Sequence, residues 1–214
     1  MISLLKALAM IEESSPINGL TPGTDFQSII DGVKSGIVDA DLCILISDNP
    51  KAMALERAKN NSIPAICIER KNYQTHEEFD EAIRKKLNEF KLDLVVLAGY
   101  MRLIRSEKFF SDFYGKMINI HPALLPNFLG THSQRDAFEH KVEFSGYTLH
   151  FVDETVDGGP IIYQEAVNIS TCKTEEEVKE KILEREHVGL PLIINTFSTG
   201  KYAIKGKKVG YVRF

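Results

Sequence analysis

The chain has 214 residues, enough to bury a sizeable core within one large domain. Hydrophobic residues make up 43% of the sequence and charged residues 26%, as in ordinary globular proteins, and the formal net charge is −4. Lys and Arg are scattered among Asp and Glu instead of forming a basic stripe, so we expect no nucleic-acid partner.

The first segment, MISLLKALAMIEESS, is the one candidate for a targeting sequence. Its apolar residues recur at helical spacing, which predicts an amphipathic helix over residues 1–15 instead. No run approaches the ~20 apolar residues that a membrane span needs. Cys43, Cys67 and Cys172 lack CxxC spacing and are expected to be reduced. These features predict a cytoplasmic protein without membrane contact.

Between residues 40 and 120 short β-rich runs alternate with longer amphipathic runs. The alternation predicts strands at 42–47, 65–69, 92–99 and 116–120, separated by helices at 51–60, 75–91 and 106–113. Parallel neighbours need such crossovers, and strands buried on both faces are apolar throughout. We therefore expect an α/β fold with a Rossmann-like, mostly parallel twisted sheet and helices on both faces.

The pattern changes after a short predicted helix at 133–140. Two strand-like runs, 147–153 and 161–169, flank a turn at Gly158-Gly159-Pro160, and a helix is expected to follow from Thr174. The basic tail, residues 200–214, predicts a small β-hairpin or edge extension. The expected sheet thus carries a C-terminal portion of hairpin and helix.

The run NIHPALLPNFLGTH, residues 119–132, follows the predicted strand at 116–120. Side chains alternate along a strand, so Asn119 and His121 share one surface. Pro122 and Pro126 fix the backbone beyond them, and Gly130 permits a positive φ. Open α/β sheets bind ligands at the carboxyl ends of their strands, which makes this stiff segment a candidate site.

An amide and an imidazolium N–H side by side can stabilise negative charge that develops on an oxygen, as in acyl or formyl transfer. Removing one such donor typically costs about 2.7–4 kcal/mol of transition-state stabilisation. A nearby carboxylate would favour the charged imidazole, and Asp157 is the best candidate.

Other interpretations of these residues remain open. Asn119 could close a turn while His121 is a core histidine. A metal site from His121, His132, His150 and Asp157 lacks any HxxxH, HxxEH or CxxC spacing. A Ser-His-Asp hydrolase lacks the GxSxG elbow.

Three motifs together resemble one family. VVLAGYMRL (95–103), NIHPALLPNFLGTH (119–132) and HFVDETVDGGPIIYQ (150–164) are similar, in order and spacing, to the phosphoribosylglycinamide formyltransferases of the folate-dependent formyltransferase family. The resemblance spans residues 23 to 200. It implies transfer of a formyl group from 10-formyltetrahydrofolate to the amine of glycinamide ribonucleotide in purine synthesis.

The resemblance also implies the roles of individual residues. Asn119, His121 and Asp157 would be catalytic. The folate would be bound by Met101, Arg102, Leu103, Val152 and Asp153, with His150 in the pocket. The acceptor would be bound by Gly23, Thr24, Asp25, Gly99, Pro122 and Glu186. No metal is implied, and the partners would be small molecules.

The domain organisation follows from the same resemblance. We expect one formyltransferase domain over 1–214, with a nucleotide-binding half at 1–100 and a folate-binding and catalytic half at 101–214. The protein would be a monomer or homodimer.

The sequence departs from the family near its start. Members have an apolar strand that runs into a Gly-Ser/Thr-Asn loop, whose N–H groups grip the substrate phosphate. Here Pro22 has no N–H and Asp25 replaces the Asn, while a helix over 1–15 would leave only residues 16–20 for the strand. A different acceptor, an impaired relative or an altered N-terminus from an upstream reading-frame change would each explain this. We hypothesise the third.

Two other functions remain alternatives to the transfer reaction. One is hydrolysis of formyltetrahydrofolate. The other is an inactive folate-binding relative with a defective phosphate loop.

Overall fold

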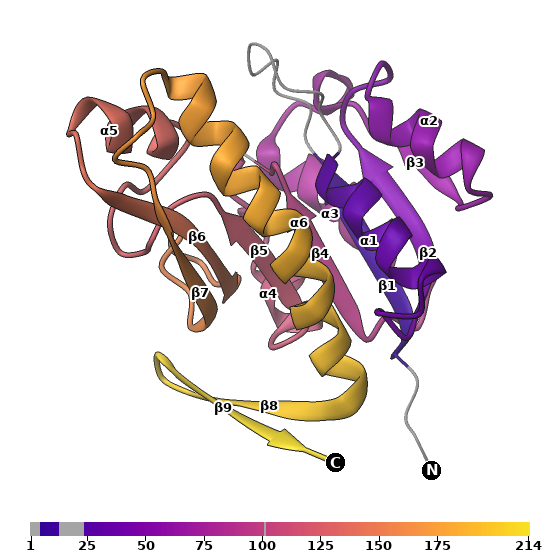
Figure 1. Cartoon of the computed structure of the whole chain (residues 1–214). Helices are drawn as coiled ribbons and strands as arrows, with labels where there is room; N and C mark the ends of the chain where they lie inside the picture. Colours follow the sequence, from indigo (N-terminus) through magenta and orange to yellow (C-terminus); the bar gives the residue numbers. More distant parts are fainter. Residues whose placement is uncertain (1–4, 13–23, 101) are drawn as a thin grey trace.

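The computed structural model describes residues 5–12, 24–100 and 102–214 (Figure 1). It contains a seven-stranded sheet of order β3-β2-β1-β4-β5-β6-β7 and a separate two-stranded sheet. The strands of the large sheet are β1 (Leu5–Glu12), β2 (Ala40–Ser47), β3 (Ala65–Cys67), β4 (Leu94–Ala98), β5 (Met117–His121), β6 (Phe144–Phe151) and β7 (Ile161–Asn168). β1 to β5 run parallel, whereas β6 and β7 are antiparallel.

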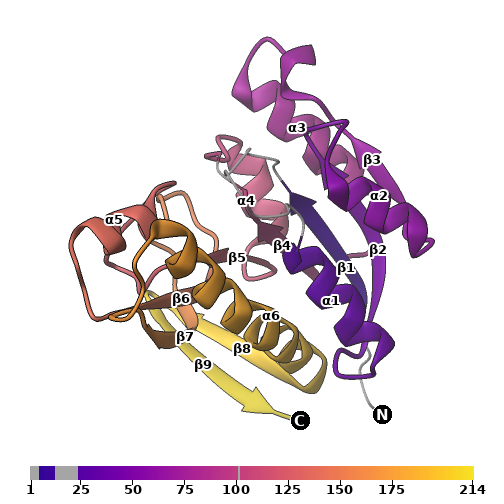
Figure 2. The same ribbon diagram turned by 45° about the horizontal axis from the view of Figure 1, so that its top comes forward.

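Helices cover both faces of this sheet (Figure 2). They are α1 (Thr24–Lys34), α2 (Met53–Asn60), α3 (His76–Leu87), α4 (Glu107–Phe113), α5 (Ser133–Glu139) and α6 (Glu175–Thr199), with a short 3-10 turn at Arg70–Asn72. α1, α2, α5 and α6 share one hydrophobic core, and α3 and α4 share the other. Among the described residues, no helix is both long and apolar enough to cross a membrane.

β4 illustrates why the sheet is apolar throughout. Leu94, Val96 and Ala98 pack into the core under α1 and α6, while Val95 and Leu97 pack into the core under α3 and α4. Successive residues thus enter opposite cores, and the whole strand is buried. The predicted parallel sheet with helices on both faces is confirmed.

The strand order indicates the edge of the sheet at which a ligand would bind, here called the ligand edge. β1 pairs with β2 on one side and β4 on the other, so consecutive connections diverge at this strand. Ligands of open α/β sheets bind outside the carboxyl ends of strands at such a switch point. The parallel strand β5 ends at the same edge, and this edge therefore receives Asn119 and His121.

The prediction of a helix over residues 1–15 is wrong where the structure describes them. Leu5–Glu12 is strand β1, and it lies in the middle of the sheet. Leu, Lys, Ala, Met and Glu all favour helices, but hydrogen bonds to strands on both sides override local propensity. The strand that seemed to be missing therefore exists upstream of residues 16–20, which lie outside the described ranges.

The predicted C-terminal portion is confirmed. β6 and β7 form the expected antiparallel pair, α6 begins after Thr174, and the tail forms the hairpin β8 (Gly200–Lys205) and β9 (Lys208–Arg213). The Thr174 hydroxyl accepts a hydrogen bond from the Glu177 amide at 3.1 Å, which caps α6.

Ile118 provides a test of this packing. It is fully buried on the face of β5 opposite Asn119 and His121. Ile118→Ala should lower the free energy of unfolding by about 2–5 kcal/mol, and Ile118→Val by about 0.5–1.5 kcal/mol, because the larger truncation leaves a cavity. Urea denaturation measures both, and equal losses for the two variants would contradict this packing.

Candidate active site

The site begins at the end of β5. Asn119 and His121 lie on the same face of the strand, as predicted, and both are buried, with 9% and 4% exposure. Antiparallel pairing places His150 of β6 opposite Asn119 and Thr148 opposite His121. Four polar side chains of two neighbouring strands thus meet at one edge of the sheet.

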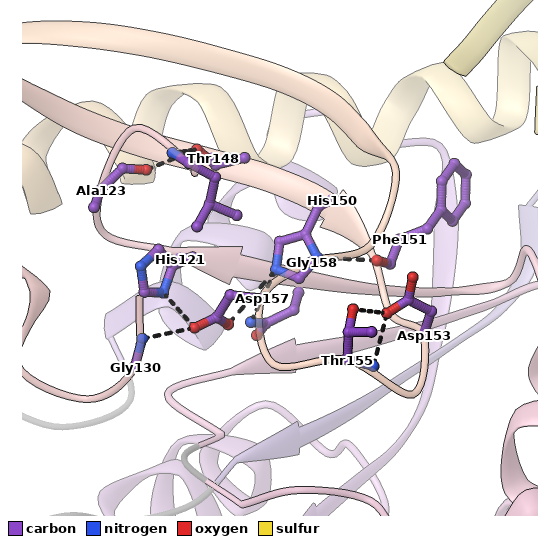
Figure 3. A network of polar contacts seen from close by, with 12 residues as sticks. His121, Ala123, Gly130, Thr148, His150, Phe151, Asp153, Thr155, Asp157 and Gly158 are labelled. Atoms are coloured by element: carbon purple, nitrogen blue, oxygen red, sulfur yellow. Dashed lines mark hydrogen bonds and ion pairs between the residues drawn. The ribbon is translucent and has the colours of Figure 1, made fainter. Parts of the chain in front are cut away.

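The loop after β6 brings Asp157 to this edge (Figure 3). Its Oδ2 lies 3.5 Å from Nδ1 of His121 and accepts a hydrogen bond of 2.9 Å from the Gly130 amide. Its other oxygen, Oδ1, lies 4.0 Å from Nε2 of His150. Asp157 is therefore positioned between two imidazoles, and its predicted proximity to His121 is observed.

Both ring nitrogens of His121 face acceptors. Nε2 lies 2.8 Å from the Phe128 carbonyl oxygen, which can only accept, so Nε2 carries a hydrogen. Nδ1 faces the Asp157 carboxylate. An imidazolium at this position directs each of its N–H groups at an oxygen.

His150 orients the Asn119 amide. Its Nδ1 donates to the Phe151 carbonyl at 2.9 Å, which leaves the lone pair of Nε2 facing the Asn119 Nδ2 at 3.4 Å. Burial lowers the pKa of His150, which favours this neutral form. The Asn119 Oδ1 is then buried without a hydrogen-bond partner. An unpaired buried acceptor of this kind is suited to a donor from a ligand.

Hydrogen bonds as well as prolines hold the segment after His121. The Thr148 hydroxyl donates to the Ala123 carbonyl at 2.7 Å and accepts from the Leu125 amide at 3.1 Å. Gln164 of β7 donates to the Leu125 carbonyl and to the Thr148 hydroxyl, both at 2.9 Å. The segment is therefore fixed to β6 and β7, and the predicted stiffness is supported.

Two backbone positions near Asp157 have positive φ. Gly130 has φ +83°, as predicted, and turns its amide toward Asp157. Asp157 itself has φ 47°, a conformation that costs a residue with a Cβ of order 1–3 kcal/mol. Such a conformation persists only where the surroundings hold it, so the contacts of this loop matter to the site.

The residues expected in a folate pocket are described in part. Arg102 forms an ion pair with Asp48, which follows β2, with 3.1 Å between Nη2 and Oδ2. Leu103 is exposed, and Val152 packs against the α3–α4 core. Asp153 accepts hydrogen bonds from the Thr155 amide and from Lys207. Met101 lies outside the described residues.

A second polar cluster lies at the start of α1. Asp25, in its first turn, has Oδ1 buried without a hydrogen bond, 3.9 Å from Nε2 of His187 on α6. Glu186, the preceding residue of α6, is 4% exposed. Burial raises the pKa of Asp25 to about 6, and burial together with Asp25 raises that of Glu186 well above its usual range. The structure thus brings together two of the expected acceptor-binding residues.

The remaining residues expected to bind the acceptor are placed separately. Gly99 follows β4 with φ 61°, and Pro122 follows β5 and is half-buried. Thr24 is the first residue of α1. Gly23 lies outside the described residues.

Sequence reasoning missed several members of the site. The Phe128 carbonyl, the Gly130 amide and His187 were not predicted, and Asp48 was not paired with Arg102. Backbone groups leave no signal in residue types, and the other partners depend on how distant segments pack. Within the described ranges, no group of three or more His, Cys, Asp or Glu side chains is arranged to hold a metal.

Comparisons with known proteins identify relatives over most of the chain. The formyl transferase family model matches residues 19–194. The phosphoribosylglycinamide formyltransferase of Haemophilus influenzae is 40% identical over 86% of this chain and 86% of its own length. The enzyme of the same name from Bacillus subtilis is 39% identical over 80% of this chain and 88% of its own.

Solved structures agree with these relatives. The crystal structure of glycinamide ribonucleotide transformylase 1 from Symbiobacterium toebii superposes with a TM-score of 0.89 at 37% identity. It covers 98% of this chain and 94% of that one.

Asp25 gives a prediction for stability against pH. Because its folded-state pKa is raised, to about 6, the folded protein loses stability relative to the unfolded chain as pH rises through the window from about 4 to 6. Asp25→Asn cannot ionise, so it should unfold at a higher temperature than the native protein at pH 8. The gain should shrink at pH 4.5.

Thermal unfolding at both pH values measures this difference. Asp31→Asn, which removes an exposed carboxylate from the same helix, is the matched control. A gain for Asp25→Asn that is the same at both pH values would contradict the prediction.

Proposed function

The chain belongs to the formyl transferase family, and we propose that it transfers the formyl group of 10-formyltetrahydrofolate to the amine of glycinamide ribonucleotide in purine biosynthesis. One observation carries the proposal: Asp157 lies 3.5 Å from His121, beside a buried Asn119 amide with an unpaired oxygen. The reaction needs such a combination of charge, donor and acceptor around one carbon atom.

We assign stabilisation of the developing negative charge to His121 and Asn119. The His121 Nδ1 is 3.5 Å from Asp157, longer than a normal N–H···O hydrogen bond, so its proton is available to a formyl oxygen bound at the ligand edge of the sheet. The Nδ2 of Asn119 has a second hydrogen besides the one directed at His150. Two fixed donors at this position favour the oxyanion over the neutral carbonyl.

Asn119 also provides an acceptor, which sequence reasoning did not anticipate. Its unpaired Oδ1 is suited to an N–H group of the attacking amine. His150 fixes the orientation of the Asn119 amide. Its Nδ1–H donates to the Phe151 carbonyl, so its Nε2 can only accept and must face the Asn119 Nδ2. We therefore propose that His150 positions Asn119 without itself meeting the substrate.

Asp157 has two tasks in this proposal. It holds His121 in the charged form and, through a water molecule, moves a proton from the attacking amine to the folate nitrogen that leaves. The C–N bond to the acceptor forms first and gives the oxyanion. The C–N bond to the folate breaks when the carbonyl re-forms, and the amine proton ends on the folate nitrogen. The Gly130 amide keeps one carboxylate oxygen in place during the transfer.

The two substrates would approach from different parts of the edge. We propose that the folate lies against residues 101–103 and the loop from Val152 to Asp157, within the half formed by residues 101–214. The acceptor would extend toward Asp25, at the start of α1, and Glu186 of α6. A protonated Asp25 can donate a hydrogen bond to a phosphate oxygen as an amide does, and its pKa of about 6 makes this form dominant below pH 6.

The proposal also covers the partners, location and oligomeric state of the enzyme. The substrates are small molecules, and neither nucleic acid nor metal is required. We expect the enzyme to work in the cytoplasm as a monomer or homodimer.

Substitutions of His121 and Asp157 should strongly slow transfer. Asp157→Asn and His121→Ala should each lower kcat for formyl transfer by about 10²–10³-fold, because each removes charge stabilisation in the transition state. Asp136→Asn, on α5, is a control that removes a surface carboxylate. A spectrophotometric assay of folate release, run with and without glycinamide ribonucleotide, measures the rates.

The same assay separates the alternatives. Folate release that needs no acceptor would identify a formyltetrahydrofolate hydrolase and contradict the transfer reaction. Tight folate binding by calorimetry, without turnover under either condition, would identify a non-catalytic folate-binding relative.

A further inference from the structure

The C-terminal hairpin reaches the loop that carries Asp157. Its turn lies between β8 and β9, and from it the Lys207 ammonium donates to Asp153 Oδ2 at 2.8 Å and to the Gly158 carbonyl. These two residues flank Asp157 in the chain. One side chain from the end of the sequence thus joins both arms of the loop.

The base of the hairpin is fixed independently of Lys207. The Tyr202 ring of β8 packs against the rings of Phe151, at the end of β6, and Phe197, in α6, with centroids 5.9 and 4.6 Å apart. The ring of Tyr211 of β9 packs against that of Tyr202 at a tilt, with centroids 5.0 Å apart. Because this aromatic cluster is anchored at the very strand end from which the loop departs, the hairpin is a rigid base for Lys207.

The other hydrogen bonds described for this loop are local or come from its inner side. Asp153 accepts a hydrogen bond of 2.9 Å from the Thr155 amide, which closes a local turn. Asp157, with φ 47°, is held from the inner side by the Gly130 amide. Although burial opposes it, the hydrogen bond from Lys207 contributes to a lowered pKa of Asp153, so the carboxylate stays charged in this contact.

We propose that the C-terminal hairpin is a restraint on the catalytic loop and that Lys207 is a positioning residue for the transfer. Lys207 acts on the arms of the loop, through Asp153 and Gly158, and thereby keeps Asp157 beside His121. This inference rests on the proposed function for the role of Asp157, but the restraint itself does not. A small displacement of Asp157 would lengthen a contact that is already 3.5 Å.

The restraint is tested first without any substrate. Hydrogen exchange followed by mass spectrometry on peptides that cover residues 153–159 should be faster in Lys207→Met than in the native protein. Lys207→Arg should retain protection because it keeps the charge. Lys205→Met, which removes an exposed lysine before the same turn, is the matched control. Equal exchange in Lys207→Met and Lys205→Met would overturn the proposal.

Kinetics test the positioning role. In Lys207→Met, kcat should fall roughly 3- to 30-fold while the KM for the acceptor stays unchanged, since misplacing a reacting group by about 1 Å can cost up to 10²-fold. Asp153→Asn should give a similar loss, and the double variant little more. About 0.5 M salt should slow the native enzyme but not Lys207→Met, because screening weakens this exposed ion pair.

The outcomes distinguish this inference from the proposed function. An unchanged kcat, or a rise only in the KM for formyltetrahydrofolate, would overturn the positioning role. A native protein without transferase activity would defeat the proposed function, and the exchange experiment would still decide whether the hairpin restrains the loop.

Discussion

The contact between Asp157 and His121 depends on a loop that must return to the ligand edge of the sheet. β6 runs antiparallel to β5, so the chain leaves β6 near the amino end of β5 and has to travel back along its neighbour. It does so in the few residues between Phe151 and Ile161, with Asp157 at positive φ. The geometry of the whole site follows from how firmly that short segment is held.

The parallel and antiparallel parts of the sheet contribute differently to this site. The parallel part supplies β5, which is buried on both faces and holds Asn119 and His121 at fixed positions. The antiparallel part supplies supporting contacts, through Thr148 and Gln164, to the segment after His121. The segment after His121 is thus held within the large sheet, whereas the loop that carries Asp157 also contacts Lys207 of the C-terminal hairpin.

Features of the fold and site that depend on neighbouring residues could be predicted from the sequence, whereas those that depend on contacts between distant segments could not. Strand β4 and helix α3 follow from local periodicity, and the shared face of Asn119 and His121 follows from the two-residue repeat of a strand. Strand β1 was missed because hydrogen bonds to two distant strands, not its own helix-favouring residues, decide its conformation. Similarly, the contact of Asp157 with Gly130 joins segments whose separation no local pattern encodes.

The carboxyl groups at Asp157 and at the start of α1 differ in how many hydrogen-bond donors surround them. The Asp157 carboxylate faces the Gly130 amide and the His121 ring. At α1, the carboxyl groups of Asp25 and Glu186 are buried beside His187. Burial, and then the charge of Arg57, lower the pKa of His187. A buried carboxyl oxygen without a donor, as at Asp25 Oδ1, is costly. A ligand that brings hydroxyl and amine hydrogens relieves that cost, while a fully ionised phosphate adds to it. The polar cluster at the start of α1 is therefore better suited to a ligand that donates hydrogen bonds than to one that only accepts them.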